Sequence, residues 1–370
     1  MRVLILSCNT GGGHNACADA IHEAFVEQGH YCNIADALDF VSEKLSKFVA
    51  WGHTAMYRHV PGLMRVGYDF AEKHPQLLQD DTAVYKLLTG GTEQLHEYIR
   101  AENYDTVICV HIFAGLLLGQ MQKEHPTPLK TALVATDYTC SPGTANSGLG
   151  CYFIPAASLT EEFQDQGVPA DRIVPSGIPV RRDFYEQADK PKAKQALGIV
   201  PGHTHLLMMC GSMGCGPLDK LAGMLSQGMD DTMELSIVCG TNEKLFEELS
   251  TKFKDMDNVH IFGFVKDMAA MMDSADLCLT KPGGLSSTEA AAKRLPMVFV
   301  DTVAGCEEYN LQFFVTMGGA VTADTPEALV QMCLELMRSE NRRMQMASAL
   351  DTLPRQNAAQ CICRTMCANG

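Results

Sequence analysis

The stretch VLILSCNTGGGH, residues 3–14, runs from a short apolar strand into Gly11, Gly12, Gly13 and His14. A helical pattern follows at residues 16–28. Strand, glycine turn and helix in this order are typical of the first unit of a doubly wound α/β domain. The glycines allow a ligand to approach the backbone, the helix start offers N–H groups, and His14 adds a group that takes up a proton near neutral pH. The stretch therefore predicts a ligand site.

The rest of the first half repeats this alternation. Further strands are predicted at residues 31–35, 106–110, 131–135 and 152–154, and helices at residues 92–102, 115–123 and 158–166. His111 and Asp137 each come directly after a predicted strand. Because parallel strands end at one edge of their sheet, we expect both residues to lie near His14.

A second α/β unit follows a stretch rich in charged and turn-forming residues, 181–202, which we interpret as a linker. Its predicted strands are residues 205–210, 234–239, 259–262, 277–280 and 297–300. Its predicted helices are residues 218–227, 243–254, 286–292, 308–317 and 326–339. The chain is therefore expected to form two doubly wound α/β domains in tandem.

Composition excludes several classes of protein. The formal net charge of the 370 residues is −15, which argues against nucleic acid as a partner. The 15 cysteines include no C-x-x-C pair, as expected of reduced thiols in the cytosol. Cys361, Cys363 and Cys367 match no common zinc spacing and are interpreted as an apolar helix face, so no metal is assigned.

No signal peptide is recognised, and the longest apolar stretch, residues 112–119, is far shorter than the roughly 18 residues of a membrane span. The protein is expected to stay inside the cell. Any membrane contact is expected to be peripheral, at the inner face of the cell membrane.

Two further glycine turns point to a nucleotide. Residues 211–214, Gly-Ser-Met-Gly, lie between a predicted strand and a helix, where backbone N–H groups hold a diphosphate. The stretch TKPGGLSSTE, residues 280–289, has the same position in a later strand–helix pair. There Lys281 supplies positive charge, and Glu289 suits the two hydroxyls of a ribose.

Six motifs in order carry a family resemblance: GGGH at 11–14, TDY at 136–138, GIPV at 177–180, VCGTNEKL at 238–245, GFV at 263–265 and TKPGG at 280–284. The chain resembles glycosyltransferase family 28, in particular its monogalactosyldiacylglycerol synthase and diacylglycerol glucosyltransferase members. The resemblance implies a GT-B fold, with two Rossmann-like domains facing across a cleft. Residues 1–181 would take the lipid acceptor, 182–341 the nucleotide sugar, and 342–370 would form a helix that returns to the first domain.

The resemblance also implies a reaction. A hexose passes from a UDP-sugar to a lipid such as 1,2-diacylglycerol, with inversion at the anomeric carbon, no metal and no cofactor. The implied contacts are Phe264 and Val265 for uracil, Glu289 for ribose, Gly211, Ser212, Met213 and Gly214 for diphosphate, Gly240 and Asn242 at the pocket border, Lys281, Gly283, Gly284 and Ser287 at its floor, and Glu307, Glu308 and Asn310 for the sugar.

One feature qualifies these contacts. Cys306 stands where the family usually has glutamine, which removes a hydrogen-bonding amide, so the resemblance does not specify the hexose. The general base is expected to be His14, with Asp137 as the second candidate and His111 as an orienting neighbour.

A basic and aromatic segment suggests membrane contact. The residues concerned are Lys44, Lys47, Phe48, Trp51, Arg58 and Arg65. Such a mixture suits an amphipathic segment at an anionic membrane surface, and a buried helix pair would show it too.

Two alternatives remain open. The pattern Gly11-x-Gly13-x-x-Ala16, with Asp36 about 20 residues on, fits an NAD(P)-dependent oxidoreductase. A degenerate protein that binds a nucleotide sugar without turnover is the other, because Cys306 departs from the family pattern.

Overall fold

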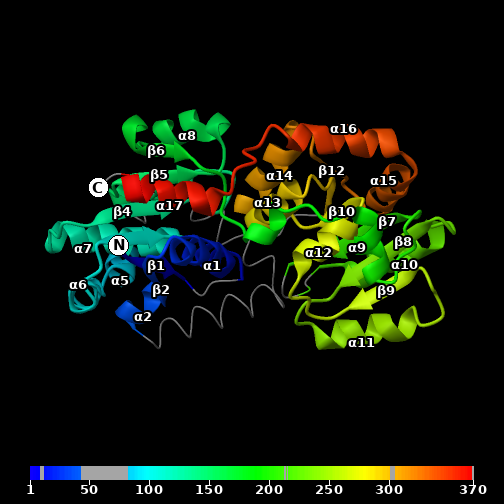
Figure 1. The fold of residues 1–370 in the computed structure, drawn as a ribbon, viewed down its shortest axis with the longest axis horizontal. Helices are drawn as coiled ribbons and strands as arrows, with labels where there is room; N and C mark the ends of the chain where they lie inside the picture. The colour runs from blue at the N-terminus through cyan, green and yellow to red at the C-terminus, as the bar shows by residue number, and fades with distance from the viewer. Residues whose placement is uncertain (9–11, 43–81, 212–213, 215, 301–304, 369–370) are drawn as a thin grey trace. The chain divides into compact units, whose positions relative to one another are not determined.

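The computed structural model describes residues 1–8, 12–42, 82–211, 214, 216–300 and 305–368. Contacts between Cα atoms divide the chain into two compact units. Unit 1 comprises Met1–Arg181, Val303–Tyr309 and Gln356–Gly370, and unit 2 comprises Arg182–Thr302 and Asn310–Arg355. In the described part of the chain, each unit contains one six-stranded parallel sheet (Figure 1). The predicted pair of doubly wound α/β domains is confirmed.

Unit 1 has the strand order β2-β1-β3-β4-β5-β6. Its strands are β1 (Arg2–Ser7), β2 (Tyr31–Asp36), β3 (Thr106–Cys109), β4 (Lys130–Val134), β5 (Cys151–Ile154) and β6 (Ile173–Pro175). Its helices are α1 (Gly12–Glu27), α2 (Ala37–Val41), α5 (Ala83–Leu88), α6 (Thr92–Ala101), α7 (Ile112–Glu124), α8 (Thr160–Asp165) and α17 (Ala358–Ala368).

Unit 2 has the strand order β12-β11-β10-β7-β8-β9. Its strands are β7 (Thr204–Met209), β8 (Met233–Val238), β9 (Val259–Phe262), β10 (Leu277–Thr280), β11 (Met297–Phe299) and β12 (Ala320–Thr322). Its helices are α9 (Lys190–Ala196), α10 (Leu218–Gly228), α11 (Glu243–Lys252), α12 (Met268–Ser274), α13 (Gly284–Ala292), α15 (Pro326–Arg338) and α16 (Glu340–Leu350), while α14 (Cys306–Thr316) has residues in both units.

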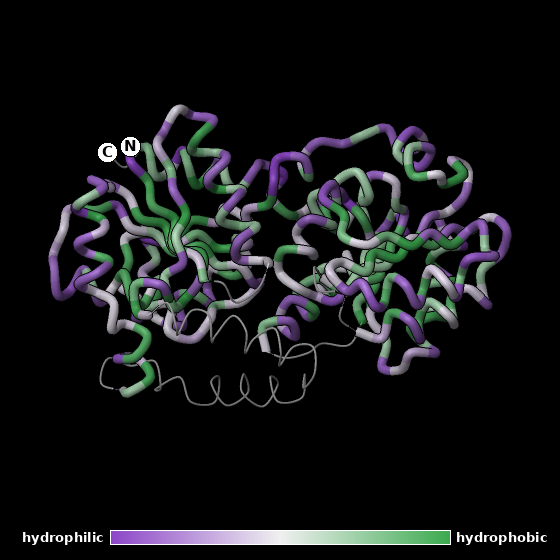
Figure 2. Tube along the Cα trace, turned by 90° about the horizontal axis from the view of Figure 1, so that it is seen from below, coloured by the Kyte–Doolittle hydropathy of each residue, from purple (hydrophilic) through white to green (hydrophobic). Residues whose placement is uncertain are grey.

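Each sheet is buried on both faces, which explains why its strands read as continuous apolar runs. In β1, Leu4 and Leu6 join a core cluster with α6 and α7. Val3 and Ile5 alternate with them and are equally buried, on the face where α1 packs. Figure 2 shows the central strands of both units in green, at the hydrophobic end of the scale. None of the described helices is long and apolar enough to cross a membrane.

The structure corrects several predicted boundaries. Residues 181–202 are not a plain linker, because α9 forms within them and packs on α12. The segment grouped with unit 1 at the C-terminal end begins at Gln356 rather than at 342, since α16 packs on α13 and α15 of unit 2. Its helix α17 packs on α1 (Figure 1). The three-residue strands β6 and β12 were not predicted, because so short a strand has no periodic pattern.

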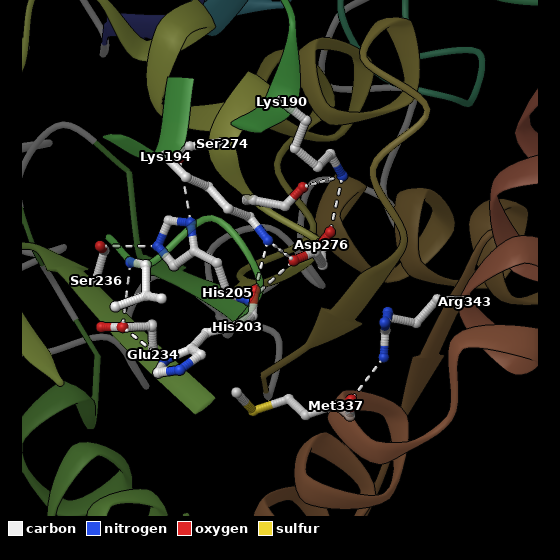
Figure 3. Close-up of polar contacts among 12 residues, drawn as sticks. Lys190, Lys194, His203, His205, Glu234, Ser236, Ser274, Asp276, Met337 and Arg343 are labelled. Atoms are coloured by element: carbon white, nitrogen blue, oxygen red, sulfur yellow. Dashed lines mark hydrogen bonds and ion pairs between the residues drawn. The ribbon is translucent and has the colours of Figure 1, made fainter. Parts of the chain in front are cut away.

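A polar network closes the amino-terminal edge of the unit 2 sheet (Figure 3). Asp276, just before β10, accepts hydrogen bonds from Lys194 Nζ at 2.6 Å, Lys190 Nζ at 3.0 Å and the His205 amide at 2.9 Å. Burial by itself raises the pKa of Asp276, but the two lysines and the His205 amide together hold that pKa below its usual value. Glu234, buried at the start of β8, contacts His203 and His260 at 2.9 and 2.8 Å.

His205 is fully buried in β7, between two serine hydroxyls. Ser274 Oγ donates to the Met271 carbonyl at 2.6 Å, so it accepts from His205 Nδ1 at 3.1 Å. His205 Nε2 then accepts from Ser236 Oγ at 2.8 Å. These contacts hold the imidazole in its neutral form, and burial lowers the pKa of His205 to about 4.

We expect unit 2 to lose stability in acid through His205. The unfolded imidazole takes up a proton near pH 6.5 and the folded one only near pH 4, so stability falls as the pH falls through this window. The loss from His205 between pH 7 and pH 4.5 should be about 2 kcal/mol. Urea unfolding at both pH values measures it. A His205→Asn variant should lose correspondingly less on acidification, and an equal loss in both proteins would contradict the assignment.

Candidate functional site

Unit 1 gathers its candidate residues where three neighbouring strands end. β1, β3 and β4 lie side by side, and their carboxyl ends lead to His14, His111 and Asp137 respectively. The chain places β2 on one side of β1 and β3 on the other. Such a switch point between neighbouring parallel strands is where open α/β sheets bind ligands. His14 lies in the first turn of α1, which begins at Gly12, four residues earlier than predicted. Ser7 Oγ donates to Asn15 Oδ1 at 2.8 Å and ties this turn to β1.

The imidazole of His14 is oriented by two groups from other strands. Its Nδ1 lies 2.9 Å from the Val110 carbonyl oxygen, just past β3. The Thr136 hydroxyl, just past β4, lies 3.2 Å from the same nitrogen. Because a carbonyl oxygen can only accept a hydrogen bond, Nδ1 carries the proton and donates a hydrogen bond to the Val110 carbonyl. The lone pair of a neutral His14 is therefore on Nε2.

The environment also favours the neutral imidazole. Burial lowers the pKa of His14 below its ordinary value of 6.5, while the Asp137 carboxylate and the Val110 carbonyl act in the opposite direction. With a lowered pKa, His14 is largely unprotonated at pH 7. A histidine in this state can accept a proton from a hydroxyl group.

His111 plays a structural part in this cluster. It is the N-cap of α7, and its Nδ1 accepts from the Phe113 amide at 3.1 Å. Its ring packs edge-on against that of His14, with 4.6 Å between centroids. Asp137 is half-buried, and its charge acts on His14. The three predicted residues therefore form one cluster, and His14 has the geometry of a base within it.

Unit 2 has its own switch point, between β7 and β10. β7 leads to Gly211 and β10 leads to Lys281, so these two residues come from neighbouring strands. Gly211 has φ +69°, and a Cβ there would lie 3.1 Å from Lys281 Cε. The lysine stem therefore lies directly against the glycine turn and brings a positive charge to it.

Gly214, further along the chain from Gly211, lies against a neighbouring loop. Its φ is +57°, and a Cβ there would lie 2.0 Å from the Cys239 carbonyl oxygen, so only glycine fits. Asn242 holds the turn in place, because its Nδ2 donates to the Gly214 carbonyl at 3.2 Å. Asn242 Oδ1 accepts from the Leu245 amide at 3.1 Å and caps α11. The side chain predicted to border the pocket thus joins two of its loops.

The helices that begin at this switch point lack side-chain caps. Elsewhere in the unit, α16 also lacks such a cap, whereas α9, α11, α12 and α15 are capped by the side chains of Asp189, Asn242, Asp267 and Thr325. The N-cap residues of α10 and α13, Pro217 and Gly283, make no such hydrogen bond. The first N–H groups of α13, whose N-cap Gly283 lies beside Lys281, are therefore suited to an anion such as a diphosphate, and the first N–H groups of α10 also lack a side-chain cap.

Two residues of α13 add polar atoms. Ser287 is fully buried, and its Oγ has no hydrogen-bond partner among the residues that the structure describes. A buried hydroxyl without a partner costs free energy, which a bound ligand would recover. Glu289 lies half-buried one turn into the same helix. Asn310 of α14 is buried and its Nδ2 donates to the Pro282 carbonyl at 3.0 Å, which fixes the turn before α13.

The remaining predicted contacts follow neighbouring strands. Gly240 follows β8, and Phe264 and Val265 follow β9, so the candidate nucleotide residues occupy the carboxyl edge of β10, β7, β8 and β9. Phe264 is 62% exposed, an unusual state for a phenylalanine and a suitable one for stacking on a base. Glu307 is buried and Glu308 exposed in the first turn of α14.

Some predicted residues lie outside the described part of the chain: Gly11, Ser212, Met213, Lys44, Lys47, Phe48, Trp51, Arg58 and Arg65. Two contacts of His14 were not predicted. The Val110 contact uses a backbone carbonyl, which no residue type in the sequence indicates. Thr136, in contrast, is next to Asp137 in the TDY motif and could have been predicted. Asp36, the proposed ribose ligand of the oxidoreductase alternative, caps α2 through the Leu38 amide at 2.9 Å.

Comparisons with known proteins match both units. A family model of monogalactosyldiacylglycerol (MGDG) synthase matches residues 14–180, and one of the glycosyltransferase family 28 C-terminal domain matches residues 205–362. A processive diacylglycerol beta-glucosyltransferase of Staphylococcus carnosus is 29% identical over 80% of this chain and 82% of its own length. One of Bacillus cereus is 25% identical over 99% of this chain and 93% of its own length.

Solved structures share the fold. MurG of Acinetobacter baumannii has a TM-score of 0.68 at 15% identity, covering 99% of both chains. The spinosyn rhamnosyltransferase SpnG has a TM-score of 0.63 at 14% identity, covering 99% of this chain and all of its own. Both are GT-B glycosyltransferases, so the predicted GT-B fold is confirmed.

Proposed function

The chain belongs to glycosyltransferase family 28, with the monogalactosyldiacylglycerol synthases and diacylglycerol glucosyltransferases, and from this membership we propose that it transfers a hexose from a UDP-sugar to diacylglycerol. The observation that carries the proposal is the uncapped start of α13, whose N-cap Gly283 lies beside Lys281, together with the uncapped start of α10. Such a site suits a diphosphate held without metal. The curated relatives named above are diacylglycerol glucosyltransferases, which supports the lipid acceptor.

The proposed reaction is a direct displacement. The acceptor hydroxyl attacks the anomeric carbon, the bond from that carbon to the diphosphate oxygen breaks, and the configuration is inverted. His14 Nε2 takes the hydroxyl proton, since Nδ1–H is engaged with Val110. The charge that develops on the leaving UDP is stabilised by helix N–H groups and Lys281. Within this proposal Glu289 binds the ribose, Phe264 and Val265 meet the base, and Glu307, Glu308 and Asn310 meet the sugar.

The proposal extends to the membrane. The basic and aromatic residues between Lys44 and Arg65 would hold the protein at the anionic inner face of the cell membrane, where diacylglycerol is found. Support comes from the sequence and from the lipid substrates named for the relatives. No bound cofactor takes part in the proposed reaction.

A transfer assay tests this function. The full chain is supplied with vesicles containing diacylglycerol and, in turn, radiolabelled UDP-glucose, UDP-galactose and UDP-N-acetylglucosamine, without added Mg²⁺ or Mn²⁺. We expect one UDP-hexose to yield labelled glycolipid on thin-layer chromatography, faster when the vesicles carry anionic lipid. UDP binding without transfer would favour the degenerate binding protein. NADH binding without UDP binding would favour the oxidoreductase.

A further inference from the structure

Three soft ligand atoms from opposite ends of the sequence meet in unit 1. They are His30 Nε2, Cys363 Sγ and Cys367 Sγ, all within 4.8 Å of one another. His30 stands between α1 and β2, and its Nε2 is 3.2 Å from Cys367 Sγ. Cys363 and Cys367 are one turn apart on the same face of α17, which packs on α1.

The spacing fits a tetrahedral cation. Around Zn²⁺, bond lengths of about 2.3 Å to sulfur and about 2.0 Å to nitrogen separate two sulfur ligands by about 3.8 Å and a sulfur from a nitrogen by about 3.5 Å. In the structure no two of the three atoms are more than 4.8 Å apart, and His30 Nε2 lies 3.2 Å from Cys367 Sγ, close to the separation that a bound cation requires. Met1 Sδ, 3.5 Å from Cys367 Sγ, adds a further sulfur atom beside them.

The ligand set selects the kind of cation. Thiolate and imidazole ligands without a carboxylate favour thiophilic metals over Mg²⁺ or Ca²⁺. Cys363 is buried, while His30 and Cys367 are half-buried, so a cation would be shielded and still reachable from solvent. Burial, followed by the neighbouring Cys367, raises the pKa of Cys363 to about 12. Metal binding must therefore release thiol protons, and affinity should rise with pH.

We propose that His30, Cys363 and Cys367 bind one thiophilic cation of the Zn²⁺ class, which fastens α17 to the remainder of unit 1. The site is independent of the proposed transferase reaction. Its effect follows from topology, because the cation would join residue 30 to residues 363 and 367 and would oppose detachment of the C-terminal helix. The cysteine spacing alone matches no common zinc pattern, and the additional ligand comes from the α1–β2 turn.

Cobalt titration tests the site without using activity. Co²⁺ is added to the metal-free full chain in a phosphine reductant, and thiolate-to-cobalt charge-transfer absorption is recorded. We expect saturation at one Co²⁺ per chain and displacement by Zn²⁺. Cys363→Ala and Cys367→Ala should each lose the signal. Cys361→Ala, on the same helix but outside the cluster, is the matched control and should keep it.

Hydrogen exchange provides a second readout. With free Zn²⁺ at 100 times its dissociation constant, exchange of the α17 amides that open by helix detachment should slow about a hundredfold. In Cys367→Ala, Zn²⁺ should not slow the exchange of these amides. Absence of the cobalt signal from the unmodified chain, its survival in both Cys363→Ala and Cys367→Ala, or its loss in Cys361→Ala would each overturn the proposal.

Discussion

Replacing His14 with alanine is expected to lower kcat for glycosyl transfer by about 10²–10⁴-fold and to leave UDP affinity unchanged. The physical reason is the loss of Nε2, the basic nitrogen left when Nδ1–H donates to Val110. The diphosphate, by contrast, is assigned to residues of unit 2, which the substitution does not touch. Initial rates with saturating donor and calorimetric titration with UDP measure the two effects separately.

A histidine on the same helix provides the control for this experiment. His22 lies two turns further along α1, and His22→Ala should keep full activity. In the unmodified protein, the acid limb of kcat/KM should lie below pH 6.5, because the lowered pKa of His14 delays its protonation as the pH falls. Full activity in His14→Ala would exclude His14 as the base, and Asp137→Asn would then be the variant to measure.

The second large effect is expected from Asp276→Ala, which should destabilise unit 2 by about 3–5 kcal/mol. This substitution leaves Lys194, whose side chain is 5% exposed, without its carboxylate partner at 2.6 Å. It also removes the acceptor of the His205 amide. An uncompensated buried charge is costly, whereas the intact pair is held by several hydrogen bonds. Hydrogen exchange of β7 and β10 in increasing urea measures the change.

Lys190→Ala is the matched control for this network. Lys190 also contacts Asp276, at 3.0 Å, but its side chain is 46% exposed, against 5% for Lys194. Removing an exposed partner should cost no more than about 1 kcal/mol. Equal stability losses in the Lys190 and Asp276 variants would show that burial of Lys194 does not govern the network.

Most of the fold could be predicted from sequence because its signals are local. The strand at residues 3–7 and the glycine turn that follows it are predicted by their own residue types. The same holds for the turn at Gly283, where α13 begins within two residues of the predicted start. Among the elements that escaped prediction is α9, since its charged sequence resembles a linker. The buried residue of α9 is Lys194, and its partner Asp276 is 82 residues away in the sequence.

The candidate site also has features that the sequence predicts and features that it does not. The sequence placed His14, His111 and Asp137 after strands, and parallel pairing of β1, β3 and β4 was sufficient to bring them together. It could not specify the tautomer of His14, because the acceptor that decides it is a backbone carbonyl 96 residues away. Nor could it show that the buried hydroxyl of Ser287 has no hydrogen-bond partner in the described part of the chain.

By itself the sequence determined most of the strands and helices, the two tandem α/β units and the identity of the residues at their glycine turns. These properties follow from periodicity and backbone preference, which act over a few residues. Only the tertiary structure decided which nitrogen of His14 is basic, that the uncapped start of α13 lies beside Lys281, and that His30 meets Cys363 and Cys367. Those properties depend on contacts between distant residues, and such contacts are set by sheet order and packing rather than by local sequence.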